Sequence, residues 1–143
     1  MSLVPPTKKN GYHDMNYINI LEKYNFQELE YGKNDCNIQF LECFEPNIYN
    51  EILGRYKTEL GGARKAKQIC GYRSIKELVL DNPNIYKPID VNFVRYGDFF
   101  VNNHHIAICL GDKTFAYVDG HFRVVDTKIF TDDVNFKPYR KDI

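Results

Sequence analysis

Residues 95–120 read RYGDFFVNNHHIAICLGDKTFAYVDG, and this stretch decides the fold. It contains runs of β-branched and aromatic residues, which are typical of strands. Turn-forming residues separate the runs: Gly97, Asn102-Asn103, Gly111-Asp112 and Asp119-Gly120. An Asp-Gly pair between two such runs predicts a tight hairpin. We therefore expect an antiparallel meander of strands over residues 94–101, 105–110, 114–118 and 122–125.

The chain before this stretch is predicted to be helical. Its expected helices cover residues 17–24, 36–44, 61–70 and 74–80, with a further helical turn over residues 50–56. Asp35 is a good N-cap, Ser74 and Glu77 form a capping box, and Gly71 is a C-cap. Pro46 is expected to end the helix that starts at Cys36. Helices first and a sheet second is an α+β pattern.

Length and charge indicate one domain without a strong electrostatic preference. The chain has 143 residues, of which 43% are hydrophobic, and 19 basic residues balance 19 acidic ones. We expect an extended arm over residues 1–12, one domain over residues 13–135, and a tail over residues 136–143. The arm and the tail are polar and lack periodicity, so neighbouring subunits would have to order them. Nothing indicates a membrane span or a signal peptide, and nucleic acid is not an expected partner.

The four cysteines are far apart and include no CxxC pair. We therefore expect free thiols in a reducing cytosol and no structural zinc. The sequence also has no GxGxxG, Walker or GxSxG motif, so no cofactor is expected.

Cys36 and His105 are the residues best placed to carry chemistry. Cys36 follows a capping Asp at the first turn of a predicted helix, where free N–H groups favour a thiolate and can hold an oxyanion. A nucleophilic cysteine needs a base, usually a histidine from elsewhere in the chain. Alternation places His105, Ala107 and Cys109 on one strand face, and a slip of one residue would present His104 instead. The simpler alternative is a core cysteine and two loop histidines.

Two segments resemble the signature blocks of NlpC-type papain-like cell-wall cysteine peptidases. These are residues 31–36 (YGKNDC) and residues 95–120. The resemblance implies a papain-like fold with Cys36 as the nucleophile and His105 as the base. It also aligns Gly97-Asp98 with the family's Gly-Asp pair and Tyr117 with the third catalytic position. The chain departs from the family at Asn37-Ile38, which stand where the family has Ser-Gly.

A closer resemblance, to small phage-encoded relatives of NlpC, covers nearly the whole chain. It is carried by the block ending at Cys36, by the strand blocks, and by residues Arg55, Tyr56, Thr58, Gly62 and Ala63. It implies a virion protein of a tailed bacteriophage, made in the host cytoplasm and placed in the tail or tail tip among other tail subunits. The alternative is a cysteine peptidase or amidase that cuts peptidoglycan peptides during DNA entry. A peptide- or small-molecule-binding domain, or a thiol acyltransferase, is a third possibility.

Residues 55–76 form a basic stretch in which Glu59 is the only acid. Its cations are Arg55, Lys57, Arg64, Lys65, Lys67, Arg73 and Lys76. A solvated helix face is one interpretation, and a docking surface for an acidic partner subunit is the other.

Overall fold

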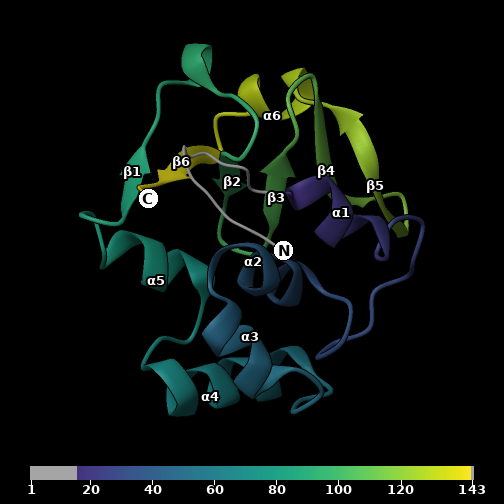
Figure 1. Cartoon of the computed structure of the whole chain (residues 1–143), viewed down its shortest axis with the longest axis vertical. Coiled ribbons are helices and arrows are strands. Elements are labelled where there is room, and N and C mark those ends of the chain that lie inside the picture. The colour runs from purple at the N-terminus through teal and green to yellow at the C-terminus, as the bar shows by residue number, and fades with distance from the viewer. Residues whose placement is uncertain (1–15, 143) are drawn as a thin grey trace.

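The structure is a computed structural model that describes residues 16–142, and it places a group of helices against one open sheet (Figure 1). The predicted arm over residues 1–12 lies outside the described residues. The helices are α1 (Tyr17–Glu22), α2 (Cys36–Phe44), α3 (Pro46–Ile52), α4 (Glu59–Cys70), α5 (Ile75–Leu80) and α6 (Lys128–Thr131), with a 3-10 turn, η1, at Val91–Phe93. The strands are β1 (Tyr86–Pro88), β2 (Phe99–Val101), β3 (Ile106–Cys109), β4 (Lys113–Val118), β5 (His121–Asp126) and β6 (Lys137–Lys141).

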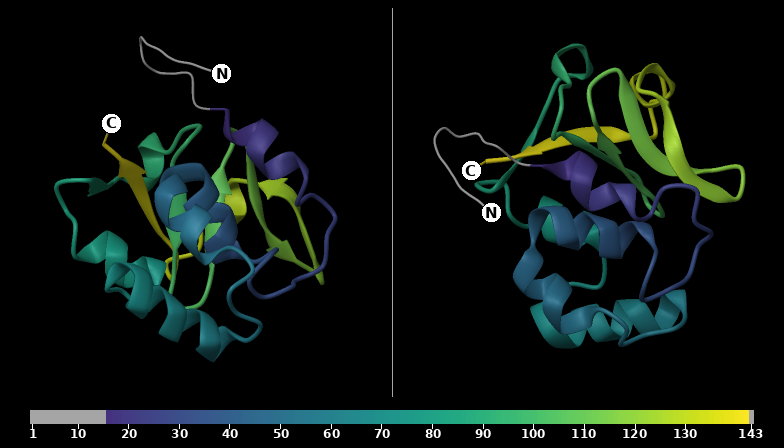
Figure 2. Two further views of the ribbon diagram at one scale, coloured as in Figure 1. Left: turned by 60° about the horizontal axis from the view of Figure 1, so that its bottom comes forward. Right: turned by 45° about the vertical axis from the view of Figure 1, so that its right-hand side comes forward.

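The six-stranded sheet has the order β1-β6-β2-β3-β4-β5, and every pairing is antiparallel. Strands β2 to β5 form the predicted meander, but its first strand starts at Phe99 and not at residue 94. The α+β class, with helices first and an antiparallel sheet second, is therefore confirmed. Helices α2 to α5 gather on one side of the sheet, as Figure 2 shows.

The main core fills the space between the sheet and this helical layer. Alternation along the strands sends Phe99, Ile106 and Ile108 towards the helices, where they meet Phe40 of α2. Phe40 and Phe99 pack edge to face, with ring centroids 4.9 Å apart. A smaller cluster covers the opposite face of the sheet, where Phe130 of α6 packs with these strand residues: Phe100, Ala107, Cys109 and Ala116.

Local sequence signals explain the helix ends. Helix α2 begins at Cys36 and ends at Phe44, as expected, and Pro46 opens α3 directly after it. Glycine at position 71 adopts φ +89° and ends α4. Ser74 accepts a hydrogen bond from the backbone N–H of Glu77 at 3.1 Å and opens α5.

The C-terminal segment is where the sequence analysis needs correction. The prediction of a tail over residues 136–143 is wrong for Lys137–Lys141, because these residues form β6 between β1 and β2. Arg140 fastens β6 to the start of β2: its guanidinium donates to the Asp98 carboxylate at 2.7 and 2.9 Å. Strand β1 was not predicted either.

Candidate functional site

The N-terminus of α2 presents Cys36 at the base of a pocket. Asp35 is extended, with φ −136°, and its carboxylate accepts a hydrogen bond from the backbone N–H of Ile38 at 2.8 Å. Cys36 is the first residue of the helix and is half-buried. The predicted cap therefore forms, and it fixes the position of Cys36 at the start of α2.

Asp35 does more than cap the helix. Its Oδ2 atom also accepts hydrogen bonds from the backbone N–H of Gly32 at 2.9 Å and from the Tyr56 hydroxyl at 2.5 Å. Asp35 is 2% exposed, so these bonds replace the water that burial removes from the carboxylate. Burial, followed by the charge of Asp35, raises the pKa of Tyr56, which keeps that hydroxyl a donor.

Glycines allow Tyr56 to reach Asp35. A Cβ atom at Gly62 would lie 2.9 Å from the Tyr56 ring, so the ring packs directly against the backbone of α4. Thr58 caps the same helix by accepting from the backbone N–H of Gly61 at 2.9 Å. Tyr56, Thr58 and Gly62 thus fix the position of α4 relative to α2.

Cys36, His105 and Tyr117 line one pocket of about 560 Å³, which is large enough for a short peptide segment. Each comes from a different element: Cys36 from α2, Tyr117 from β4, and His105 from the residue just before β3. His104 lines the same pocket. The structure therefore brings together all three site residues that the sequence analysis selected, and it places both histidines beside them.

The electrostatics of Cys36 favour the neutral thiol. Burial raises the pKa of Cys36 to about 12, and the charge of Asp35 adds to this. Backbone N–H groups of Ile106, Cys36 and Asn37 act in the opposite direction, since they favour the thiolate, but they do not offset the loss of water. The helix N-terminus is thus present as predicted, but desolvation dominates.

The histidines and Tyr117 are not bonded to Cys36. The backbone N–H groups of His104 and His105 donate to Asn102 Oδ1 at 2.8 and 2.7 Å, which shapes the turn between β2 and β3. Within residues 16–142, no hydrogen bond joins the His105 ring to Cys36 or to Tyr117. The Tyr117 ring instead packs edge to face against Phe122, at a centroid distance of 5.0 Å.

Two further pocket residues were missed by the sequence analysis. Tyr31 and Glu59 both line the pocket, and the pKa of Tyr31 is raised by burial and then by the charge of Glu59. The sequence carried one signal for each residue: Tyr31 is the aromatic residue of the block that ends at Cys36, and Glu59 is the only acid in the basic stretch of residues 55–76. Neither signal reveals that the two side chains face the same space.

The Gly97-Asp98 pair has a structural function in this chain. Gly97 has φ +93°, and a Cβ atom there would lie 3.1 Å from the Tyr17 ring. Asp98 is 1% exposed and is held by Arg140 and by the backbone N–H of Arg95. Gly97 and Asp98 therefore join parts of the fold and do not line the pocket.

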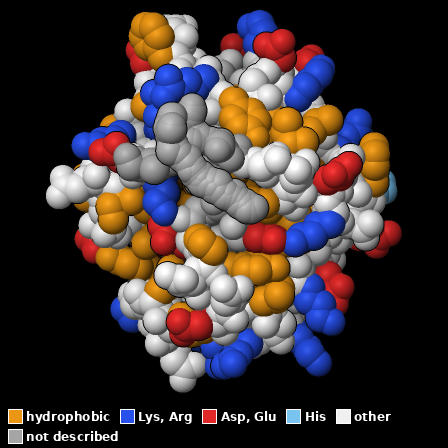
Figure 3. All heavy atoms as spheres, in the orientation of Figure 1, with side chains coloured by type: hydrophobic (Ala, Val, Ile, Leu, Met, Phe, Trp, Pro, Cys, Tyr) orange, Lys and Arg blue, Asp and Glu red, His pale blue; other side chains and the backbone are white. Residues whose placement is uncertain are grey.

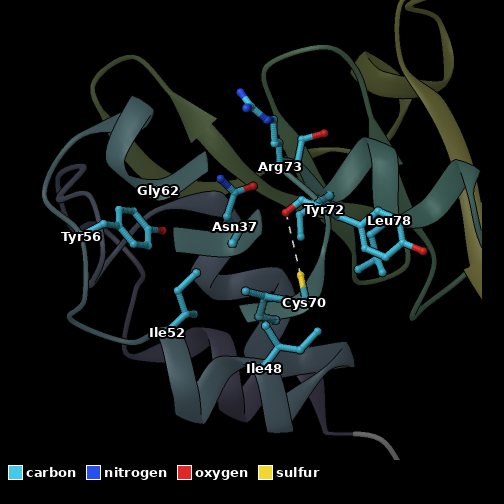
Figure 4. A pocket seen from close by; sticks show the side chains of 13 residues that line it. Asn37, Ile48, Ile52, Tyr56, Gly62, Cys70, Tyr72, Arg73 and Leu78 are labelled. Atoms are coloured by element: carbon cyan, nitrogen blue, oxygen red, sulfur yellow. Dashed lines mark hydrogen bonds between the residues drawn. The ribbon is translucent and has the colours of Figure 1, made fainter. Parts of the chain in front are cut away.

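A second hollow lies under α4 and adjoins the Cys36 pocket. It measures about 30 Å³, which holds one or two water molecules, and Asn37, Tyr56 and Gly62 line both spaces. Figure 4 shows Tyr56 and Asn37 on one side of this hollow, with Cys70, Tyr72 and Leu78 on the other. Tyr56 therefore separates the two spaces as well as binding Asp35.

The described residues offer no metal cluster. Among residues 16–142, no group of three or more His, Cys, Asp or Glu side chains is arranged to hold a metal ion. In the same range, no helix is both long and apolar enough to cross a membrane.

The fold and the pocket define an α+β protein with a cysteine-centred pocket between a helix N-terminus and an antiparallel sheet. Residues 12–131 match the family described as Domain of unknown function (DUF6950), so the chain belongs to that family. No curated protein and no solved structure matches the chain.

Proposed function

We propose that this chain is a papain-like protein of the NlpC type that serves as a structural component of a phage tail, with its cysteine pocket kept as part of the fold. The papain-like assignment is supported by the order of parts. A helix that begins with Cys36 packs on an antiparallel sheet, and His105 directly precedes the strand next to the Gly97-Asp98 strand. The tail location is supported by the resemblance to phage-encoded relatives.

Two observations favour a building block over an active enzyme. The thiol of Cys36 has a pKa of about 12, and no described hydrogen bond links it to His105. A cysteine nucleophile acts as the thiolate, and a base must come within about 3 Å of it, allowing for some looseness without substrate. The raised pKa of Cys36, and the lack of a hydrogen bond to His105 among the described residues, support the structural role.

The structural role is tested on purified phage particles from cells that carry the gene. Mass spectrometry of intact, gradient-purified tailed particles should detect this chain in a fixed ratio to the major tail protein. Phage from which the gene has been deleted should produce particles with incomplete tails. Recovery of the chain only from the soluble lysate, with normal tails on particles that lack the gene, would contradict the proposal.

A cysteine peptidase or amidase acting on peptidoglycan peptides is the second candidate. It is favoured by the common pocket that Cys36, His105 and Tyr117 line. In that reaction the Cys36 sulfur would attack the amide carbon and His105 would pass the sulfur's proton to the leaving amine. The Cys36 backbone N–H would hold the oxyanion, and Tyr117 would orient the imidazole.

The pH dependence of Cys36 alkylation separates the two candidates. Because the pKa is raised, the thiol stays protonated at neutral pH, and the rate with iodoacetamide should rise about tenfold per pH unit from pH 7 to pH 10. His105→Ala should leave this profile unchanged, as should His121→Ala, which removes an exposed histidine of β5. An apparent pKa below the free-thiol value of about 8.5 that rises only in His105→Ala would show an activated pair and favour the enzyme instead.

A further inference from the structure

Three hollows adjoin one another around the turn between β2 and β3. The Cys36 pocket shares Asn102, His104 and His105 with a neighbouring hollow of about 170 Å³. That hollow in turn shares Lys76, Asn102 and His104 with a third, of about 420 Å³, which reaches β6. We infer that these hollows form one groove, and that the two hollows beyond the Cys36 pocket bind an extended acidic polypeptide.

The charges along the groove favour an anionic ligand. Arg73 and Lys76 line the middle hollow, and Lys76 and Lys137 line the third. Within residues 16–142, none of these three cations has a carboxylate partner; Lys76 donates to Asn103 Oδ1. Among the described residues, Asp35 and Glu59 are the acids that line the groove; Glu59 borders both the Cys36 pocket and the middle hollow, and no acid lines the third hollow. Acidic side chains would therefore be attracted to the part of the groove that leads away from Cys36.

The uncharged groups favour a polypeptide over a nucleic acid. Asn103 and Asn135 line the third hollow, and an amide side chain both donates and accepts hydrogen bonds, as a peptide group does. Binding of single-stranded nucleic acid relies on several aromatic rings that stack with bases, whereas among the described residues Tyr139 is the only Phe, Tyr or Trp that lines the second or third hollow. The groove thus offers cations for acidic side chains and amides for the backbone between them.

Only part of the basic stretch of residues 55–76 lines the groove. Arg73 and Lys76 belong to the groove, whereas Lys57 and Lys67 are exposed and line none of the three hollows. Lysine and arginine side chains also gather along the lower edge of the face in Figure 3, where Figure 1 places α4. If any basic surface bound the acidic ligand, charge reversal at Lys57 and at Arg73 would weaken binding alike. If the groove binds it, only the reversal at Arg73 should do so.

The test is the binding of a fluorescein-labelled (Glu-Gly)5 peptide to the full chain, followed by anisotropy at low salt. Arg73→Glu with Lys137→Glu should weaken binding at least about tenfold, because each reversal replaces an attraction by a repulsion. Lys57→Glu with Lys87→Glu makes the same change in net charge outside the groove and should alter the affinity by less than about twofold.

Several outcomes would overturn the inference. These are equal losses in the two double variants, absence of binding to the wild type, or tighter binding of a labelled ten-nucleotide oligothymidine. Should the reversal variant fail to fold by circular dichroism, Arg73→Gln with Lys137→Gln should still weaken binding by several fold. The inference does not depend on Cys36 chemistry, since neither the peptide nor these variants involves the thiol, so the alkylation result and the binding result are independent.

Discussion

At the scale of single residues, Gly32 shows how tightly the approach to Cys36 is built. Its φ is +87°, and a Cβ atom would overlap the carbonyl oxygen of Tyr56. Its N–H binds Asp35 and its carbonyl accepts from the N–H of Gly54 at 2.7 Å. Backbone from two separate segments therefore meets here, and only a residue without a side chain fits.

Gly32→Ala should destabilise the protein by about 3 kcal/mol or more. The left-handed conformation costs an alanine about 1–2 kcal/mol, and the overlap with backbone adds a further 1–3 kcal/mol, approximately. Gly54→Ala is the matched control: its φ is +76°, but nothing lies within 4 Å of the added Cβ atom, so it should cost only about 1–2 kcal/mol.

Urea unfolding followed by far-UV circular dichroism measures both variants, and it suits a chain that contains no tryptophan. Equal free energies of unfolding for Gly32→Ala and Gly54→Ala would show that the backbone at Tyr56 moves aside freely. The site would then be less rigid than these contacts indicate.

The sequence predicted the cap of Cys36 but not its protonation state. Asp35 and the helix start are local features, and both are as expected. The pKa of Cys36 depends on how much water the sheet and the segment around Tyr56 exclude from the sulfur, and this is set by residues far away in the chain. The link between Tyr56 and Asp35 was hidden for the same reason, because the two residues are 21 positions apart.

At the scale of elements, β6 was hidden from sequence analysis by its composition. Its five residues read KPYRK, and a proline within a run argues against an interior strand. Yet Pro138 is buried opposite Phe100, and its carbonyl accepts from the N–H of Ile89 at 3.0 Å. Strands β3, β4 and β5 were predicted because their alternation is regular and their turns carry strong signals.

Arg140 should be the residue of β6 that contributes most to stability. Arg140→Ala leaves the buried Asp98 carboxylate without its guanidinium partner, and we expect a loss of about 3 kcal/mol, since breaking a buried ion pair costs about 3–5 kcal/mol and Arg140 is partly exposed. Lys137→Ala, on the same strand but exposed and without an ion partner, should cost less than about 0.5 kcal/mol.

Chemical denaturation measures the loss of stability in Arg140→Ala and in Lys137→Ala. If Arg140→Ala is no more destabilised than Lys137→Ala, the pairing with Asp98 does not hold β6 in the sheet. Adding Asp98→Asn to Arg140→Ala should recover part of the loss, because the amide is neutral and costs less to leave unpaired.

At the scale of the whole molecule, the helical layer covers the sheet unevenly. Helices α1, α2, α3 and α5 supply buried residues to the main core, whereas α4 has none. Helix α4 instead borders the Cys36 pocket and the hollow beneath it through Glu59, Gly62 and Ala66. Sequence patterns identify the helices and the meander, but not how the layers meet.

The position of β6 has a consequence for the order in which the protein is made. On the ribosome β6 is synthesised after every other strand of the sheet, yet it lies between β1 and β2. The nascent chain can pair β2 to β5 early, but β1 has no sheet neighbour until β6 emerges. Until then Asp98 has no Arg140 to bind. Completion of the sheet is thus a late event of synthesis, and a premature stop codon even a few residues before Lys141 would release a chain with an open gap in its sheet.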